Sequence, residues 1–369
     1  MTHKLFTLAL AFIASISTIS AEIIEHVQIG DLYYNMDTDN LTAEVTHLNE
    51  WYEDDNYNLT EIVIPTLVTH NEVTYSVTSI GESAFEKCHS MTAVTIPNGI
   101  TSIGYRAFFD CTALTSIEIP NSVTSIGESA IWGCTGLTSI VIPNSVTSID
   151  KGAFEGCTGL TSIELPNSIT SIADYTFSRC ESLTSLTIPN SVTIIGDEAF
   201  EMCSGLISMI IPNNVTYLGY EAFNACTGLI SVTLPNSITS IGKNTFEGCY
   251  SLTSITIPNS ITSIGKSAFE VCYAFASITC EAVTPPTLGD GVFRFVDTSI
   301  PLYVPAESID AYKAADQWKD FYNILALEEA NEIVYDPKQS TKLLHNGQIL
   351  LRGEKTFTVT GQQVKLYDY

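Results

Sequence analysis

Apolar and polar positions follow a repeated order through the middle of the chain, and residues 114–136 illustrate one 23-residue period. Leu114, Ile117 and Ile119 are apolar, and the residues between them are polar. This alternation predicts a strand with one buried face. Pro120 follows and ends the strand, because proline has no N–H to donate to a ladder.

The second half of the same period predicts two further elements. Val123 and Ile126 are apolar with polar residues between them, and we expect a second, short extended segment there. Gly127 ends this segment. Residues 128–134 have the spacing of one or two helical turns, with their apolar side chains on one face.

Single residues keep the interval of 23 over the whole array. Each period contains one cysteine at the same place, and these cysteines are Cys88, Cys111, Cys134, Cys157, Cys180, Cys203, Cys226, Cys249 and Cys272. A period of this length is typical of a solenoid, in which each repeat is one coil that buries its apolar face against its neighbours. We therefore predict an α/β solenoid with a parallel β ladder on one side and short helical turns on the other.

Residues 22–77 predict a β-rich N-terminal cap and an irregular first coil. Residues 32–34 and 42–45 are strand-like and flank a run of turn-forming residues, as in a hairpin. Residues 60–65 have the pattern of a coil's main strand, and residues 73–80 lead into the array. A cap is expected because an uncovered terminal coil would pair with other chains.

Nine coils of 23 residues are expected over residues 78–280, after which the rhythm fails. Residues 281–330 predict a C-terminal cap, with a strand at 299–304 and an amphipathic helix at 305–321. Residues 331–369 predict a short β tail, in which short apolar runs are separated by glycine turns.

The chain has 369 residues, of which 45% are apolar and 15% charged, and its charge is one-sided. Lys and Arg number 15 against 41 Asp and Glu, so the formal net charge is −26. Nucleic acid is not an expected partner, because binding phosphates requires clusters of basic residues. The same charge favours solubility and repels other copies, so we expect a monomer.

Residues 1–21 predict a signal peptide. Lys4 precedes an apolar run over residues 5–16, and small residues up to Ala21 supply a cleavage site. The run is too short for a good membrane span, and no later segment reaches eighteen uninterrupted apolar residues. Export to the cell surface or the medium is therefore expected, without a membrane-spanning segment.

The ten cysteines raise the question of disulfides, since exported proteins usually pair their cysteines. Nine of them recur at one place in consecutive coils, three residues after a large apolar residue such as Phe85. We interpret them as a buried core ladder of free thiols, with disulfides or a metal site as the alternatives. No metal or cofactor is expected, because the sequence has no CxxC and its six histidines are scattered.

Catalytic motifs are missing from the sequence. It has no GxSxG, no GxxxxGK[ST] and no HExxH. The acidic run at residues 53–56 is interpreted as a solvated loop, with weak Ca²⁺ binding as the alternative, since it lacks the spaced ligands of a dedicated loop. An enzyme is therefore not expected.

A binding surface is predicted on the exposed side of the main strands. The residue between the two buried positions varies most within the repeat, and in successive coils it is Thr95, Glu118, Val141, Glu164, Thr187, Ile210, Thr233 and Thr256. A broad polar face of this kind suits proteins or glycans better than a small molecule in a deep pocket. The alternative is that these residues are merely compatible with an exposed strand.

The repeat unit Ser-Ile-Gly-x-x-Ala-Phe-x-x-Cys-x-x-Leu-Thr-Ser-Ile-x-Ile-Pro-Asn-Ser-Val-Thr resembles the BspA-like leucine-rich repeats of bacterial and protist surface proteins. The resemblance covers residues 78–280, and residues 42–45 and 300–305 resemble the flanks of that family. It implies a right-handed leucine-rich repeat coil, export to the cell surface, and adhesion to host extracellular proteins, glycans or other cells. The alternative function is a structural surface spacer without a specific ligand.

The C-terminal tail carries a second resemblance. Residues 346–364 are similar to a shortened sorting domain of the type IX secretion route of Bacteroidetes. This resemblance implies a sorting signal, and a simple terminal hairpin is the alternative.

Overall fold

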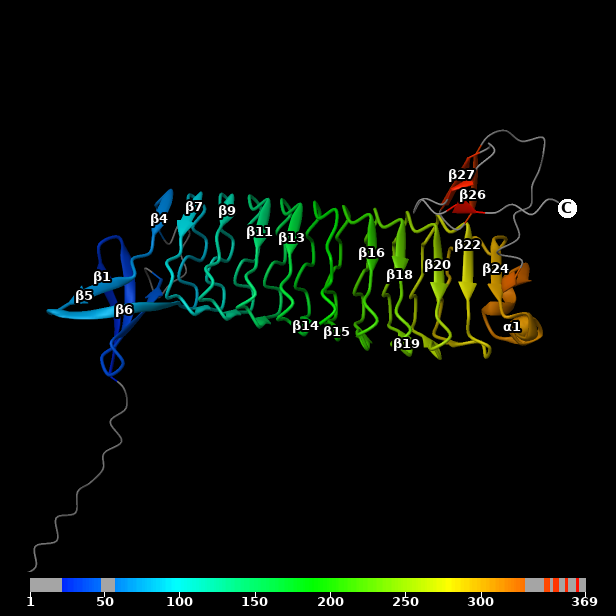
Figure 1. The fold of residues 1–369 in the computed structure, drawn as a ribbon, viewed down its shortest axis with the longest axis horizontal. Coiled ribbons are helices and arrows are strands. Elements are labelled where there is room, and N and C mark those ends of the chain that lie inside the picture. Colours follow the sequence, from blue (N-terminus) through cyan, green and yellow to red (C-terminus); the bar gives the residue numbers. More distant parts are fainter. Residues whose placement is uncertain are drawn as a thin grey trace, which may run out of the picture.

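The computed structural model describes residues 22–47 and 57–328, together with the backbone of four short strands beyond residue 341. Residues 1–21 and 53–56, interpreted above as a signal peptide and an acidic loop, lie outside the described residues. The described chain forms an elongated solenoid of stacked coils, with a β cap at its N-terminal end and short helices at the other (Figure 1). The predicted solenoid architecture is confirmed.

In most coils the main strand lies where apolar and polar residues alternate before the proline, and strands that pair do so in parallel. The ladder is interrupted at residues 183–189, which form no strand. The register is one full repeat, so that Val141 of one strand lies beside Glu164 of the next. These strands are β4 (Glu61–Val63), β7 (Ala93–Thr95), β9 (Ser116–Ile117), β11 (Ser139–Val141), β13 (Ser162–Glu164), β16 (Ser208–Ile210), β18 (Ser231–Thr233), β20 (Ser254–Ile257), β22 (Ser277–Cys280), β24 (Pro301–Val304) and β25 (Asn323–Ala326).

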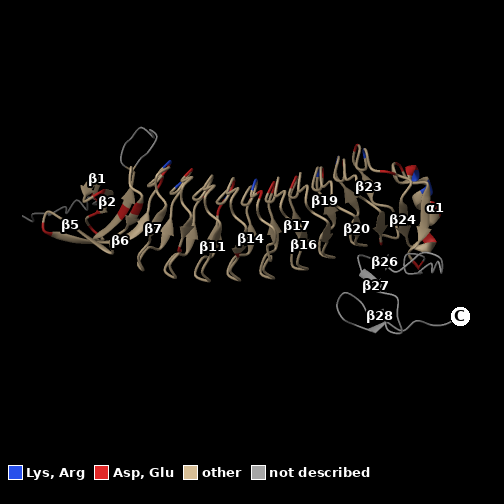
Figure 2. Cartoon of the chain, turned by 90° about the horizontal axis from the view of Figure 1, so that it is seen from above, with Lys and Arg blue, Asp and Glu red and all other residues tan. Residues whose placement is uncertain are grey.

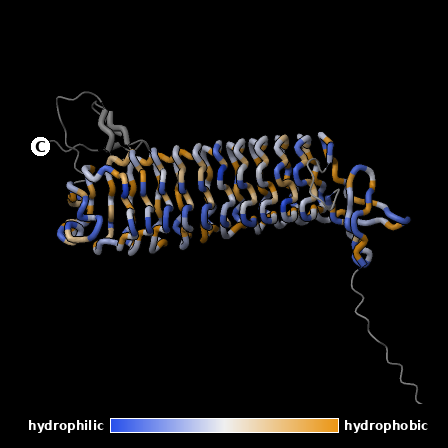
Figure 3. The backbone as a smooth tube through the Cα atoms, turned by 180° about the vertical axis from the view of Figure 1, so that it is seen from behind, coloured by the Kyte–Doolittle hydropathy of each residue, from blue (hydrophilic) through white to orange (hydrophobic). Residues whose placement is uncertain are grey.

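A second parallel ladder forms where the sequence predicts the short extended segment. Except for the last one, its pairs also keep the 23-residue register, as in Ile126 beside Ile149. Its strands are β6 (Val73–Ile80), β8 (Ser102–Ile103), β10 (Ser125–Ile126), β12 (Ser148–Ile149), β14 (Ser171–Ile172), β15 (Ile194–Ile195), β17 (Tyr217–Leu218), β19 (Ser240–Ile241), β21 (Ser263–Ile264) and β23 (Thr287–Leu288). Hydrophobic and hydrophilic stretches recur at the same place from coil to coil (Figure 3).

The segment at 128–134 differs from its prediction, because it forms consecutive turns and not a helix. Ala130 N donates to Gly127 O within the coil, at 3.2 Å, whereas Ile131 N donates to Ala153 O of the next coil, at 2.9 Å. Ser129, at φ 54°, has the left-handed conformation that breaks a helix. Alternate N–H groups therefore bind the neighbouring coil, and the turns add a third set of bonds between coils.

The core contains a column of stacked aromatic rings. Phe154, Phe177, Phe200, Phe223, Phe246, Phe269 and Phe293 stack face to face with ring centroids 5.1–5.7 Å apart. Ile131 takes the equivalent position between Phe108 and Phe154 and so interrupts the column. The column runs along the solenoid and ties each coil to both neighbours.

The cysteines form a second buried column. All ten are free and buried. From Cys111 to Cys272, each thiol donates a hydrogen bond to the backbone carbonyl 26 residues earlier, with S···O distances of 3.0–3.3 Å, as between Cys180 and Phe154. The thiols therefore hold adjacent coils together without covalent bonds.

The N-terminal cap is a meander of β1 (Ile23–Ile29), β2 (Leu32–Asp37) and β3 (Thr42–Thr46). Strand β2 pairs antiparallel with β1 and with β3, and β3 then pairs in parallel with β6 of the second ladder. The expected hairpin is present as β2 and β3, whereas β1 was not predicted. A further strand, β5 (Leu67–His70), folds back on β6 within the irregular first coil.

At the C-terminal end the stacking continues beyond residue 280, where the sequence pattern predicts the cap. Ser263 pairs with Thr287, 24 residues later, so this coil is one residue longer and the rhythm of 23 fails although the coil persists. The expected helix at 305–321 is wrong in length. Three short pieces replace it, η1 (Ala306–Ser308), α1 (Ile309–Ala314) and η2 (Trp318–Asp320), because the backbone is extended at Ala315 and left-handed at Gln317.

The tail holds two antiparallel strand pairs. Strand β26 (Lys342–His345) pairs with β27 (Gln348–Leu351), and β28 (Thr356–Phe357) pairs with β29 (Gln363–Val364). Within the described part of the chain, none of the helices has the length and hydropathy that a bilayer span requires.

Candidate functional site

The eight residues predicted to face outward form one row along the main ladder, and all eight are exposed. Where the strands pair, the 23-residue register places a residue of the row beside its counterpart in the next coil, as for Ile210 and Thr233. Thr187 lies in a coil that has no main strand. The buried residues on either side fix the direction of the row, since their side chains enter the core. The row is Thr95, Glu118, Val141, Glu164, Thr187, Ile210, Thr233 and Thr256.

A groove with a volume of about 760 Å³ crosses this row at β9, β11 and β13. Its lining includes Glu118, Val141 and Glu164, and the prolines and asparagines of the following turns complete the wall. Val141 is 63% exposed and lies between the two carboxylates. The lining residues include neither Lys nor Arg, so the groove is negatively charged at its two ends and apolar at its centre.

This geometry suits an extended ligand better than a metal ion. Strands in a ladder are about 4.8 Å apart, so the backbones of Glu118 and Glu164, two rungs apart, are separated by about 10 Å. A ligand with N–H or O–H donors at both ends could therefore bond to both carboxylates while its middle covers Val141. Exposed hydrogen bonds of this kind fix orientation, and the apolar contact adds burial.

A second part of the row is apolar. Ile210 is 72% exposed, and Ile207 and Ile230, on the neighbouring outward column, are also exposed. Most other coils carry Thr in that column, where its hydroxyl donates to the carbonyl of the preceding coil, as in Thr115 to Thr92. Sequence reasoning identified Ile210 but missed Ile207 and Ile230, and their departure from the repeat consensus was the available signal.

Charged residues gather mainly along a different edge of the solenoid, that of the turns (Figure 2). Several of them pair between adjacent coils, including Lys151 with Asp174 at 2.7 Å and Lys243 with Glu221 at 3.4 Å. Exposed pairs of this kind contribute little to stability. Because the charged residues gather along the turns, the main ladder face is poor in charge, and Glu118 and Glu164 are exceptions on it.

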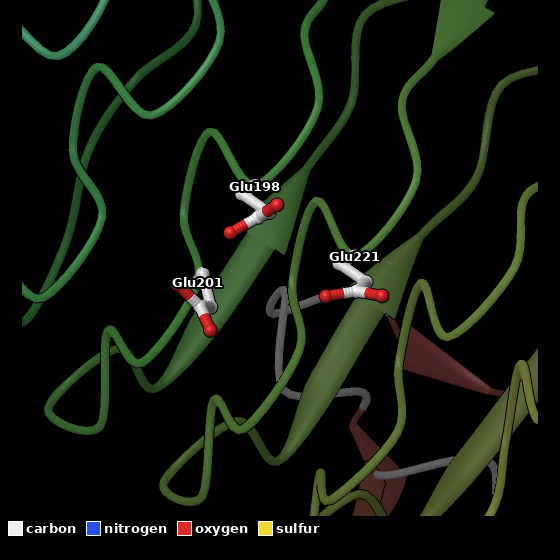
Figure 4. A group of neighbouring side chains, drawn as sticks. All are labelled: Glu198, Glu201 and Glu221. Carbon is white, nitrogen blue, oxygen red and sulfur yellow. The ribbon is translucent and has the colours of Figure 1, made fainter.

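The turn edge holds a cluster of three carboxylates, Glu198, Glu201 and Glu221, whose ligand atoms lie within 4.8 Å of one another (Figure 4). Protein groups already bind them. Ser178 Oγ donates to Glu201 at 3.1 Å, and Asn244 Nδ2 donates to Glu221 at 3.0 Å.

Burial raises the pKa of Glu198 above its usual value, and the charges of Glu201 and Glu221 raise it further. Oxygen ligands of this type suit Ca²⁺. The partners present account for the cluster as a hydrogen-bonded network.

Comparison with protein families matches the chain to the BspA type leucine-rich repeat region, in 6 copies over residues 78–207 and 193–305. Comparison with curated proteins gives no match.

Several solved structures are similar to the chain. A leucine-rich cell surface protein from Faecalibacterium prausnitzii A2-165 is 25% identical, with a TM-score of 0.44, over 87% of this chain and 99% of that one. A leucine-rich repeat protein from Bacteroides ovatus is 25% identical, with a TM-score of 0.37, over 82% of this chain and 99% of that one.

The matched family region covers more than half of the chain and coincides with the stacked coils. Its repeat accounts for the two ladders, the ring column and the thiol column together. The chain therefore belongs to the family of BspA type leucine-rich repeat proteins.

Proposed function

We propose that this protein is an exported, surface-displayed binding protein that acts as an adhesin without catalysis. Its ligands would be extracellular proteins or glycans, held on the exposed face of the main ladder. The observation that carries the proposal is the groove across β9, β11 and β13, where Glu118, Val141 and Glu164 interrupt a face that is otherwise rich in Ser and Thr. Membership of a family with cell-surface relatives supports the location.

Binding at this groove depends on two carboxylates and one apolar side chain. Replacing both Glu118 and Glu164 by Gln removes the charges and keeps the shape, and Val141→Lys adds a long cation at the centre. Both changes are on exposed positions, where substitutions alter stability by less than about 0.5 kcal/mol. A loss of binding would therefore reflect the surface and not the fold.

The test is a binding screen of the chain against extracellular matrix proteins and a glycan array, followed by the variants on every ligand that binds. Glu128→Gln with Glu181→Gln is the matched control, since both carboxylates are exposed and neither lines the groove. We expect the groove variants to lose binding and the control to keep it. Equal binding by all variants would refute the groove, and no binding by the wild type would favour the structural spacer.

A further inference from the structure

Two histidines that are 21 residues apart in the sequence meet in the N-terminal cap. His26 lies in β1, and His47 directly follows β3. Their Nε2 atoms are 3.3 Å apart, and the rings are nearly perpendicular, at 76°, with centroids 4.8 Å apart. Both side chains are half-buried. The histidines are scattered in the sequence, but the fold brings two of their ring nitrogens together.

A β-bulge orients His26. The pairing of β1 with β2 shifts register between Ile24 and Val27, and His26 within the bulge has φ 54°. Asn35 Oδ1 accepts a hydrogen bond from His26 N at 3.1 Å and so holds this backbone in place. A left-handed backbone is costly for a residue with a side chain, and bulges often redirect side chains at functional sites.

The His47 ring is also fixed by neighbours. Its Nδ1 lies 3.3 Å from Oγ1 of the buried Thr46, and the backbone of Glu82 forms a hydrogen bond with the ring. Hydrogen bonds to one imidazole nitrogen typically orient the other toward a metal.

We propose that His26 and His47 are two ligands of a site for a transition-metal ion of the Zn²⁺ type. In a tetrahedral site with Zn–N bonds of about 2.0–2.1 Å, two nitrogens are separated by about 3.3–3.4 Å. The observed separation of 3.3 Å matches this value, and in the structure a hydrogen bond joins the two ring nitrogens across it. Imidazole pairs also suit Cu²⁺ and Ni²⁺.

The site has a structural consequence. A bound ion would join β1 to the end of β3, and β3 pairs with the first strand of the second ladder. The metal would thereby fasten the outermost strand of the cap to the solenoid. This proposal does not depend on the function proposed for the groove.

The test is a titration of Zn²⁺ into the metal-free full chain at pH 7.5, followed by calorimetry. The variants are His26→Asn, because Asn tolerates the left-handed backbone at this position, and His47→Gln. His70→Gln is the matched control, since that half-buried ring bonds to Asn71 on the neighbouring hairpin. We expect one equivalent of Zn²⁺ in the wild type and the control, and an affinity lower by more than about ten-fold in either site variant.

A second measurement separates ligation from a merely structural role. Cu²⁺ added in place of Zn²⁺ should give an electron paramagnetic resonance spectrum with hyperfine coupling to two imidazole nitrogens, and this coupling should be lost in His26→Asn, with folding checked by circular dichroism. Zn²⁺ uptake that survives both site variants would overturn the proposal. So would uptake lost in Glu201→Gln and not in His26→Asn, or no uptake by the wild type.

Discussion

Replacing Phe200 by Leu should destabilise the solenoid by more than a simple change of side-chain shape. Phe200 is fully buried and stacks on Phe177 at 5.5 Å and on Phe223 at 5.1 Å. Each aromatic pair contributes about 0.5–1.5 kcal/mol beyond its buried area. The loss of two pairs therefore costs about 1–3 kcal/mol, in addition to up to about 1.5 kcal/mol for the altered shape.

The chain supplies its own control for the stacking contribution. Ile131 is fully buried at the same position of its coil, but it has no aromatic ring to stack. Ile131→Leu should therefore cost only the shape change, below about 1.5 kcal/mol. Leu is also smaller than Phe, so the difference between the two variants contains the stacking contribution of about 1–3 kcal/mol together with the cost of the lost volume.

Urea unfolding followed by circular dichroism measures this difference through linear extrapolation. The slope m must be equal in both variants, since a change in m would indicate that the array unfolds in parts. If Phe200→Leu and Ile131→Leu differ by less than about 0.5 kcal/mol, the ring column contributes only buried area and the reasoning is wrong.

Three further outcomes can be measured. Burial raises the pKa of Cys203 to about 12, so Ellman's reagent should label the buried thiols slowly in buffer and rapidly in guanidinium; fast labelling of the native chain would contradict this. The raised pKa of Glu198 means that its stabilising protonation is complete below pH 4.5 and is lost as pH rises through the folded-state pKa. Glu198→Gln should therefore raise Tm at pH 7 and flatten its increase towards pH 5, and an unchanged pH profile would refute this. A Cβ at Gly219 would lie 2.4 Å from the Gly196 backbone, so Gly219→Ala should lower the free energy of unfolding in urea by about 3 kcal/mol or more. Gly30 is the control, because it lies at an uncrowded turn with φ 62°, and Gly30→Ala should cost about 1 kcal/mol. Equal costs for the two variants would contradict the close approach at Gly219.

The sequence predicts those features of the fold that depend on inward-facing side chains. Ile117 and Ile119 mark the main strand and Ile126 marks the second ladder, because burial on one face imposes a spacing of apolar residues. The turns were misread as helical because Phe and Cys three residues apart satisfy a helix pattern equally well. What separates the two is the bonding of N–H groups to the next coil, which leaves no trace in the spacing.

The candidate sites show the same limit. The exposed row was predictable because a fixed register converts a sequence interval into a spatial neighbour, as for Val141 and Glu164. The meeting of His26 and His47 was not predictable, since it depends on a bulge in β1, a strand that the pattern did not predict. Contacts within the repeat follow from its period, whereas contacts in the caps depend on local backbone geometry.

Inward and outward residues of a coil have different roles, and this explains at which positions a substitution can change ligand binding without loss of the fold. Stability resides in the inward columns, where rings and thiols contact both neighbours. The outward positions contribute little to packing. Ile207 and Glu118, at positions where other coils have Thr, therefore change the free energy of unfolding little. Different coils can therefore acquire different surfaces, one acidic at β9–β13 and one apolar around Ile210, on one stack of coils. A ligand that spans several rungs is selected by the combination, and the spacing between its contacts is set by the ladder itself.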